Sequence, residues 1–274
     1  MPQSNTINFQ HQNIHYLKYG NGDKVILAFH GFGQQASDFE LLANAWHTEY
    51  TTYAFDLFYH GKSYWNERDT PMTKEYWTGF ISYFLNEYGI KRFSVCGFSL
   101  GGKFAIATLE AFAPAIDEII LLAPDGIKTN PWYSLATYPG ALKQYFRSMI
   151  VKPNRFFRLI NMAKRLGVVD KGILKFAASQ MNTRKKRRRV YYAWVVFKNL
   201  YFDMPSMAAL INDHNITLRM YLGTHDKIIT QKGMSNLLNH LDDYDLHIID
   251  SGHNHLIEKV SDFIAQKNNQ KNSL

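Results

Sequence analysis

The segment Phe93–Phe112 constrains the fold of this chain more than any other. An apolar run, Phe93–Cys96, leads into Gly97-Phe98-Ser99-Leu100-Gly101-Gly102 and then into a helical pattern over Leu100–Phe112. A strand that turns into a helix this sharply needs a strained backbone at its middle residue, and flanking glycines remove the clashes that Cβ atoms would cause. We therefore expect the Ser99 hydroxyl at the carboxyl edge of a sheet, in front of a helix N-terminus.

The rest of the chain alternates strand patterns with helix patterns. β-Branched and aromatic runs predict eight strands, at Thr6–Phe9, Ile14–Tyr19, Val25–His30, Thr52–Asp56, Phe93–Cys96, Glu118–Leu122, Thr217–Leu222 and Leu246–Ile249. Amphipathic patterns predict helices at Ser37–Trp46, Lys74–Tyr88, Leu100–Phe112, Gly233–Leu241 and Leu256–Gln266. This alternation is typical of an α/β fold, a mostly parallel sheet with helices on both faces. The turn signal Gly20-Asn21-Gly22-Asp23 predicts an antiparallel hairpin between the second and third strands.

Residues 127–205 interrupt the alternation and are expected to form a helical, strongly basic insertion. Residues 1–126 and 206–274 then make up the core. The insertion holds 17 Lys and Arg against 2 Asp and Glu, whereas the rest of the chain holds 14 basic and 21 acidic residues. Residues 155–166 place Arg155, Arg158 and Arg165 on one helical face and apolar side chains on another.

Composition and cysteine usage bear on the compartment. Hydrophobic residues make up 46% of the chain and charged residues 20%, as in an ordinary globular protein. The chain has no apolar run of membrane-spanning length and no signal-peptide pattern at its N-terminus. Its single cysteine, Cys96, cannot form an internal disulfide. We therefore expect a cytoplasmic protein.

Two further motifs supply candidate partners for Ser99. Gly223-Thr224-His225-Asp226-Lys227 follows the strand Thr217–Leu222, and Ser251-Gly252-His253-Asn254-His255 follows the last strand. An acid at the end of one strand can reach a histidine on the next loop, and the chain order serine, acid, histidine fits a nucleophile on a strand-to-helix turn. We predict Ser99 as the nucleophile, His253 as the general base and Asp226 as the acid that orients the base.

Other acids and histidines lie close to these motifs. Asp125 follows the strand Glu118–Leu122, which is an occasional alternative position for the acid, and Asp250 and His255 flank His253. The strand that Asp226 follows favours it over Asp125. His255 is expected to cap the helix that begins near Leu256.

The loop His30-Gly31-Phe32-Gly33 directly follows the third predicted strand. It is placed to supply one backbone N–H group of an oxyanion hole, from Phe32, while Leu100 supplies the other. Two such donors stabilise a tetrahedral intermediate, and the loss of one costs about 3–4 kcal/mol. A plain strand-to-helix turn is the alternative interpretation of this loop. His30 is expected to brace the loop rather than to react.

Taken together, the motifs HGFG, DLFYHGKS (Asp56–Ser63), GFSLGG, GTHDKII and SGHNH resemble those of the α/β-hydrolase superfamily, over essentially the whole chain outside residues 127–205. The resemblance implies an eight-stranded α/β-hydrolase sheet with a cap, or lid, inserted after the sixth strand. Family members often read D-x-x-G-x-G-x-S in the second motif, whereas Tyr59 and His60 here replace the first glycine and its neighbour. The candidate substrate-binding residues are Phe98, Tyr59, Trp132, Arg155 and Arg158.

The basic insertion has two interpretations. Its cations, including the unbroken run Arg184–Arg189, can form a solvated face whose long side chains cover apolar surface. They can also form an electrostatic funnel over the active site, which would attract an anionic substrate, an acidic carrier protein or an anionic membrane. The resemblance to cap-bearing esterases that act on acyl carrier protein is one of charge and location only. Nucleic acid is the less expected partner, because a recognition motif is absent.

These features predict a serine hydrolase that cleaves a carboxylic ester or thioester of a small molecule, or an anionic or carrier-linked acyl substrate, through an acyl-enzyme and without a cofactor or a metal. Two alternatives stay open. One is non-hydrolytic or C–C bond chemistry on the same triad, because the histidine loop and the basic insertion are similar to those of cyclohexadiene carboxylate synthases. The other is a catalytically idle binding module for an acidic partner.

Overall fold

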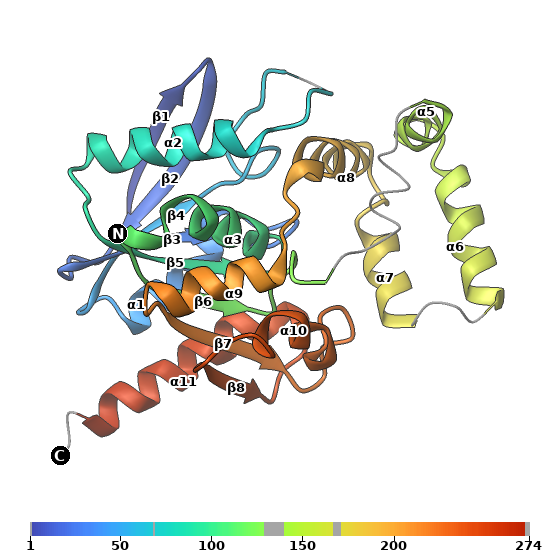
Figure 1. Ribbon diagram of the computed structural model, residues 1–274. Helices are drawn as coiled ribbons and strands as arrows, with labels where there is room; N and C mark the ends of the chain where they lie inside the picture. The colour runs from blue at the N-terminus through green and yellow to red at the C-terminus, as the bar shows by residue number, and fades with distance from the viewer. Residues whose placement is uncertain (1, 68, 129–139, 167–170, 272–274) are drawn as a thin grey trace. The chain divides into compact units, whose positions relative to one another are not determined.

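The computed structural model describes residues 2–67, 69–128, 140–166 and 171–271, and the chain divides into two compact units (Figure 1). The first unit comprises residues 1–66, 73–128 and 200–274, and the second comprises residues 67–72 and 129–199. The second unit therefore falls within the predicted insertion except for residues 67–72. Residues 200–205 belong to the first unit, because Asp203 caps its helix α9 (Met204–Asp213).

A sheet in the order β1-β2-β4-β3-β5-β6-β7-β8 runs through the first unit (Figure 1). Its strands are β1 (Gln3–Phe9), β2 (Gln12–Tyr19), β3 (Lys24–Phe29), β4 (Tyr50–Phe55), β5 (Phe93–Phe98), β6 (Ile116–Leu122), β7 (Thr217–Gly223) and β8 (Asp245–Ile249). The β1–β2 and β2–β4 pairs are antiparallel, and every later pair is parallel. The prediction of an eight-stranded, mostly parallel α/β sheet is confirmed for the described residues.

The predicted hairpin between the second and third strands is wrong. β4 lies between β2 and β3 and pairs with both of them. The segment Gly20–Asp23 crosses the start of β4 so closely that a Cβ on Gly20 would lie 2.5 Å from the Tyr50 carbonyl oxygen. The glycines of this segment therefore allow the backbone to pass close to the start of β4, and they do not form a tight turn. The real hairpin joins β1 to β2 through Gln10 and His11, which both have positive φ, as hairpin turns require.

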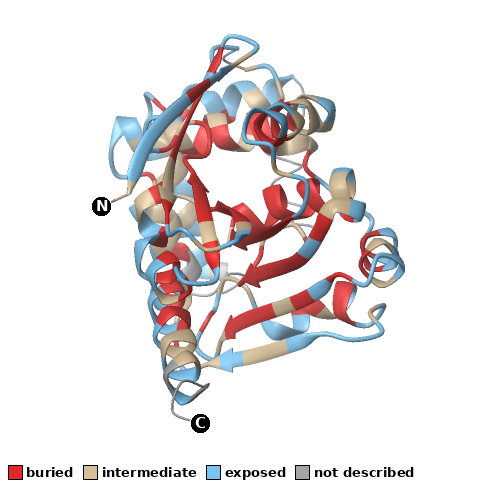
Figure 2. Cartoon of the chain, turned by 90° about the vertical axis from the view of Figure 1, so that its left-hand side faces the viewer, coloured by how far each residue is buried: buried red, intermediate tan, exposed pale blue. Residues whose placement is uncertain are grey.

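Helices cover both faces of the sheet and bury its central strands (Figure 2). Helix α1 (Glu40–Ala45) packs with α11 (Leu256–Lys271). Helices α2 (Lys74–Glu87), α3 (Gly101–Phe112), α9 and α10 (Gln231–Leu238) pack in sequence against one another. The predicted helices of the core are thus present, within a few residues of their expected bounds.

The parallel strands bring several loops to one edge of the sheet. Phe29 of β3 is in register with Gly97 of β5, and Phe98 with Leu122 of β6. Toward the other edge of the sheet, Leu122 of β6 is in register with Tyr221 of β7, and Gly223 of β7 is in register with Ile249 of β8. The loops that follow these five strands therefore begin at the same level and lie beside one another.

Helix α3 packs closely on the sheet because its first turn carries glycine. An ideal Cβ on Gly101 would lie 1.8 Å from the carbonyl oxygen of Phe29, and one on Gly97 would lie 2.6 Å from the Gly101 oxygen. Any side chain at either position must push the helix away from β3 and β5. The short connection between β5 and α3 depends on this approach.

The second unit is helical in its described part. It contains α5 (Ala141–Ser148), α6 (Asn154–Leu166), α7 (Lys171–Ser179) and α8 (Arg184–Val196). Residues 67–72 belong to it because Asp69 accepts hydrogen bonds from Arg147 and Tyr191, and the Met72 N–H donates to the Val196 carbonyl at 2.8 Å. Within the described ranges, no helix of either unit is both long and apolar enough to cross a membrane.

The cation run at the start of α8 is partly structural. Arg187 donates to the carbonyls of Ile150 and Met181 at 2.9 and 3.0 Å, and Lys186 donates to the Ser179 carbonyl at 3.1 Å. These acceptors lie at or just beyond the C-terminal ends of α5 and α7, where carbonyls lack helical partners and the helix dipole favours positive charge. Part of the run therefore ties neighbouring helices together, which neither interpretation of the sequence anticipated.

We predict that Gly101→Ala lowers the free energy of unfolding by about 3 kcal/mol, because the new Cβ overlaps the backbone of β3. Gly233→Ala is the matched control. Gly233 also lies in the first turn of a helix, α10, but its Cβ would meet nothing closer than 3.5 Å. This variant should be neutral or more stable by up to ~1 kcal/mol. Urea denaturation of both variants checks the difference, and equal stability would contradict the packing argument.

Candidate active site

Ser99 lies on the turn between β5 and α3 in a strained conformation. Its φ of 50° falls in the left-handed region, which costs a non-glycine residue roughly 1–2 kcal/mol. Its N–H donates to the Leu122 carbonyl at 3.0 Å, and its own carbonyl accepts from the N–H groups of Gly102 and Asp125, both at 2.8 Å. These three bonds hold the strained residue at the end of the central strands. The neighbouring Cys96 is fully buried, which raises the pKa of its thiol, so it serves as a neutral core residue.

His253 bridges Ser99 and Asp226. Its Nε2 lies 2.9 Å from the Ser99 Oγ, and its Nδ1 lies 2.6 Å from the Asp226 Oδ2. A carboxylate only accepts hydrogen bonds, so Nδ1 carries the proton and Nε2 is left as the acceptor of the Ser99 hydroxyl. The side chain of His253 is 9% exposed and that of Asp226 is 0% exposed, so water competes little for either bond.

The Asp226 carboxylate is oriented by its own loop. Its Oδ1 accepts from the N–H groups of Ile228 and Ile229 at 2.7 and 2.9 Å, which leaves Oδ2 for the imidazole. The loop is bonded to the histidine loop, since the His225 N–H donates to the Ser251 carbonyl at 3.0 Å. Gly223 permits this approach, because a Cβ there would lie 2.5 Å from the same oxygen.

The competing residues named from the sequence lie elsewhere. The Asp125 carboxylate accepts from the Gly126 N–H and lies 3.7 Å from the Lys103 ammonium. Asp250 pairs with His225 on the surface. His255 is exposed and lies beside Glu258 rather than in the triad. Of the alternatives, the structure brings only Asp226 and His253 together with Ser99.

The two predicted oxyanion donors lie at the N-terminus of α3 and in the loop His30–Gly33. Leu100 is the N-cap residue of α3, and its N–H donates to no acceptor in the described part of the protein. On the other loop, the His30 Nδ1 donates to the Gly31 carbonyl at 2.7 Å, and its Nε2 accepts from the Leu57 N–H at 3.0 Å. Because the Gly31 carbonyl and the Phe32 N–H share one peptide plane, His30 fixes the direction of that N–H. His30 thus braces the loop.

The loop Asp56–Ser63 packs against the loop His30–Gly33. Asp56 is buried and accepts from the N–H groups of Ala36 and Lys62 at 2.6 and 2.8 Å. Tyr59, which stands where the family often has glycine, has a φ of 66° and so adopts the conformation that glycine favours. The ring of His60 lies between those of His30 and Phe32, with centroids 5.2 Å from each. The departure from the family pattern is therefore accommodated by strain at Tyr59 and by ring packing.

A second Ser-His-Asp set occurs in the first unit and was not anticipated. The Ser4 Oγ lies 2.9 Å from the His15 Nε2, and the His15 Nδ1 lies 2.7 Å from the Asp56 Oδ2. Ser4, however, is an exposed residue of the extended edge strand β1, with no helix N-terminus behind it. The Asp56 carboxylate also accepts from the backbone N–H groups of Ala36 and Lys62, which belong to two different segments. We assign this set a structural role, namely to attach β1 and β2 to the loop Asp56–Ser63.

The candidate substrate-binding residues are distributed between both units. Phe98 is buried, and its ring lies 5.1 Å from that of His253, so it supports the base from the side. Tyr59 is half-buried in the first unit. Arg155 and Arg158 lie on α6 of the second unit, where Arg155 donates to the Ser148 hydroxyl and stacks over Tyr145. Trp132 lies outside the described residues.

We predict that Asp226→Asn slows the labelling of Ser99 by a fluorophosphonate about 10⁴-fold at neutral pH. The amide would accept from Ile228 and Ile229 and donate to the His253 Nδ1, which puts the histidine proton on Nε2 and prevents it from acting as a base. The control is Asp125→Asn, which should label at the wild-type rate. Equal rates for Asp226→Asn and wild type would contradict the assignment of the acid.

Comparisons with known proteins agree with this geometry. The family model described as alpha/beta hydrolase fold matches residues 24–260. Among curated proteins, the dihydrolipoyllysine-residue acetyltransferase component of the acetoin cleaving system of Cupriavidus necator is 32% identical over 114 residues. That stretch is 41% of this chain and 30% of the relative, so the match spans less than a third of the relative's length.

Several solved structures are similar over nearly the whole chain. A thermophilic esterase from Thermogutta terrifontis has a TM-score of 0.68 at 14% identity, covering 98% of each chain. An enol-lactonase from Burkholderia xenovorans has a TM-score of 0.66 at 17% identity, covering 97% of this chain and 98% of the other. Naproxen esterase from Bacillus subtilis has a TM-score of 0.64 at 15% identity, covering 98% and 91%. These likenesses show a shared fold, and the family match over residues 24–260 shows that the chain belongs to the α/β-hydrolase family.

Proposed function

We propose that this protein is a serine hydrolase that cleaves a carboxylic ester or thioester through an acyl-enzyme on Ser99. The observation that carries the proposal is the continuous hydrogen-bond chain from the Ser99 Oγ through His253 to a fully buried Asp226. A binding protein needs neither the strained backbone at Ser99 nor a His253 imidazole whose proton is held on Nδ1, away from the serine hydroxyl. The esterases and the enol-lactonase among the similar structures share the fold on which this arrangement lies.

The first step is attack on the substrate carbonyl. As the Ser99 oxygen bonds to the carbonyl carbon, its proton passes to the His253 Nε2, and the imidazolium that forms is stabilised by Asp226. The carbonyl oxygen becomes negatively charged and is bound by the N–H groups of Leu100 and Phe32. The N-terminus of α3 adds a positive partial charge at this point.

The second step releases the leaving group. The imidazolium returns its proton to the departing alkoxide or thiolate, which leaves the acyl group esterified to Ser99. A water molecule then takes the place of the hydroxyl, gives a proton to His253 and attacks the acyl carbon. Collapse of this second intermediate frees the carboxylic acid and restores the Ser99 hydroxyl.

Acyl transfer to another acceptor is a second candidate outcome of the same intermediate. The Cupriavidus necator relative is named as an acetyltransferase, and an acyl-enzyme passes its acyl group to any nucleophile that enters in place of water. Alcohol and thiol acceptors therefore belong in the assay. A polycarboxylate substrate tests the non-hydrolytic alternative on the same triad.

We predict that the wild-type protein hydrolyses p-nitrophenyl esters in a series from acetyl to decanoyl, and that Ser99→Ala loses about 10⁶-fold in kcat. The acyl chain length that gives the highest kcat/KM reports how long an acyl chain the pocket accommodates. Ser4→Ala is the matched control, because its serine belongs to the second Ser-His-Asp set. It should keep the wild-type rate.

Two results would contradict the proposal. If the wild-type protein is inert on every ester and its Ser99 resists a fluorophosphonate, the triad does not act as a nucleophilic site. If Ser99→Ala retains the rate while Ser4→Ala loses it, the second set is the catalytic one.

A further inference from the structure

Exposed apolar side chains are concentrated in one short stretch of the second unit. In the described part of the chain, five of the large hydrophobic side chains that are exposed lie between residues 142 and 162. They are Leu142, Tyr145, Val151, Leu159 and Met162, with Val151 67% and Met162 54% exposed. All five belong to α5, to α6 or to the turn between them. Large side chains left in water over so short a segment indicate a surface that meets a partner.

The outward face of α6 interleaves these apolar side chains with arginines. Residues three or four apart on a helix are neighbours on its surface. Met162 has this spacing to Arg158, Leu159 and Arg165, so all four side chains share one side of α6. Arg158 and Arg165 are exposed as well. The expected separation of the arginines from the apolar side chains is therefore wrong for Leu159, which is exposed on the same side of the helix as Arg158 and Arg165.

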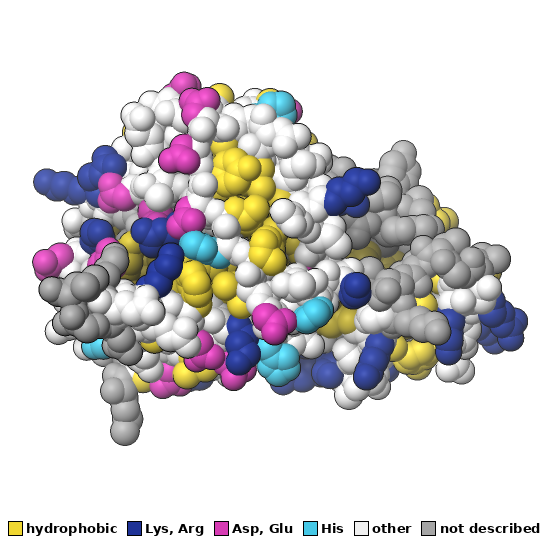
Figure 3. Space-filling view, turned by 90° about the horizontal axis from the view of Figure 1, so that it is seen from below, with side chains coloured by type: hydrophobic (Ala, Val, Ile, Leu, Met, Phe, Trp, Pro, Cys, Tyr) yellow, Lys and Arg dark blue, Asp and Glu magenta, His cyan; other side chains and the backbone are white. Residues whose placement is uncertain are grey.

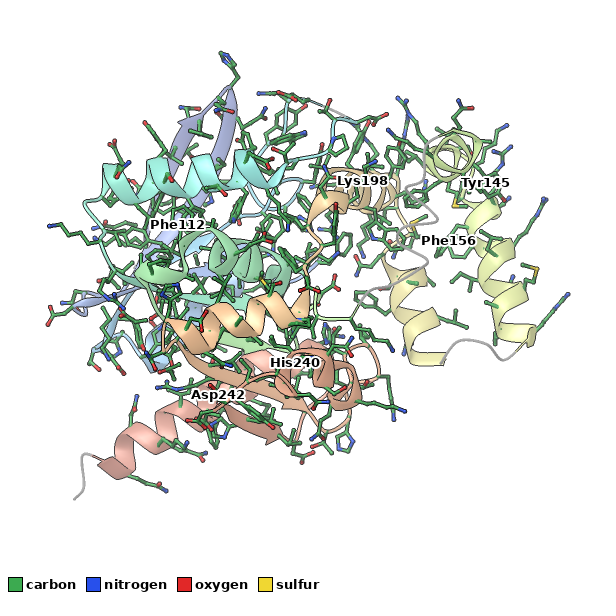
Figure 4. All side chains as sticks on the ribbon, viewed as in Figure 1. Phe112, Tyr145, Phe156, Lys198, His240 and Asp242 are labelled. Carbon is green, nitrogen blue, oxygen red and sulfur yellow. The ribbon has the colours of Figure 1, made fainter. Side chains whose placement is uncertain are left out.

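This face is not part of the core of the second unit. Phe156, from the other side of α6, lies between α6 and α7 (Figure 4). Tyr145 turns toward the start of α6, where the Arg155 guanidinium lies 5.3 Å from its ring centroid and donates to Ser148. The contact fixes α5 to α6, so the exposed side chains of the two helices form one surface. We define the α5–α6 patch as Tyr145, Val151, Arg158, Leu159, Met162 and Arg165.

The charge around the patch has one sign. Residues 140–166 contain seven Lys and Arg and no Asp or Glu. In the space-filling view, Lys and Arg side chains lie beside hydrophobic ones on this unit (Figure 3). A partner that covers the patch must therefore accept apolar side chains and supply negative charge in the same plane.

We propose that the α5–α6 patch docks the protein on an anionic lipid surface. Tyr145, Val151, Leu159 and Met162 enter the region between headgroups and acyl chains, and Arg158 and Arg165 extend to lipid phosphates. Arginines alternate with apolar groups on this face, and mobile lipid headgroups adapt to such a mixture more readily than the fixed side chains of a folded protein. An acidic protein is therefore the less favoured partner. The inference does not depend on the proposed hydrolysis, because the patch lies wholly within the second unit.

The test measures how purified Ser99→Ala protein partitions onto vesicles, so that turnover plays no part. Vesicles of phosphatidylcholine alone are compared with vesicles containing 30% phosphatidylglycerol, each in low and high salt. We expect binding to the anionic vesicles that weakens with salt. Each basic residue near such a surface contributes about five-fold in partitioning, so Arg158→Glu/Arg165→Glu should bind at least 20-fold more weakly.

The apolar contribution is tested separately. Leu159→Ser/Met162→Ser keeps the charge and should weaken binding about ten-fold or more. Leu41→Ser and Lys91→Glu, exposed positions of the first unit, are the matched controls and should bind like the parent protein. Circular dichroism of each variant checks that it is folded.

Three outcomes would overturn the inference. Equal binding by Leu159→Ser/Met162→Ser and the parent would mean electrostatic adsorption without insertion of the patch. Equal loss in the control variants would place the contact elsewhere. Binding to an acidic acyl carrier protein but to neither kind of vesicle would assign the patch to a protein partner.

Discussion

The close approach of helix α3 to strand β3 is the constraint on which the site depends. At Gly101 the helix backbone lies where a Cβ would overlap the Phe29 carbonyl, so only glycine allows the contact. The approach forces the chain to turn within a single residue, and Ser99 takes the strain of that turn. Ser99 therefore lies directly before the N-terminus of α3, whose N-cap residue is Leu100. The nucleophile and the positive end of a helix are thus brought together by backbone packing, before any side-chain hydrogen bond is considered.

The rest of the chemistry follows from the register of the parallel strands. Ser99, Asp226 and His253 follow β5, β7 and β8, which end at one edge of the sheet. The set Ser4, His15 and Asp56 has similar distances but a different setting. Its serine lies on an extended edge strand, so it lacks backbone donors aimed at a developing negative charge. Since that electrostatic term is usually the largest in acyl transfer, three side chains in hydrogen-bond contact do not by themselves make a catalytic site.

Much of the core could be predicted from the sequence because its signals are local. The apolar runs of the central strands β3, β5 and β6 indicate burial on both faces, and the Gly97–Gly102 motif indicates a turn that only certain residues can make. Strand pairing is not local, which is why the residues of Gly20–Asp23 indicate a hairpin although the segment crosses the start of β4. The roles of His15 and Asp56 could not be predicted either, because they meet across 41 residues in a buried contact that no spacing rule describes. Tyr59 illustrates a third limit, since its positive φ is imposed by the surrounding loop rather than by its own preference.

The basic segment shows how charge counts can mislead. Arg184–Arg189 is the densest cation run in the chain, yet Lys186, Arg187 and Arg189 donate to acceptors on neighbouring segments of their own unit. A guanidinium that satisfies helix-end carbonyls is held in place and has fewer donors left for a partner. On α6 the arginines are fewer, but Arg158 and Arg165 are exposed to water beside exposed apolar side chains. Binding to a partner is favourable only for groups whose free energy falls when they are removed from water. The exposed apolar side chains of the α5–α6 patch meet this requirement, whereas the longest run of charge does not.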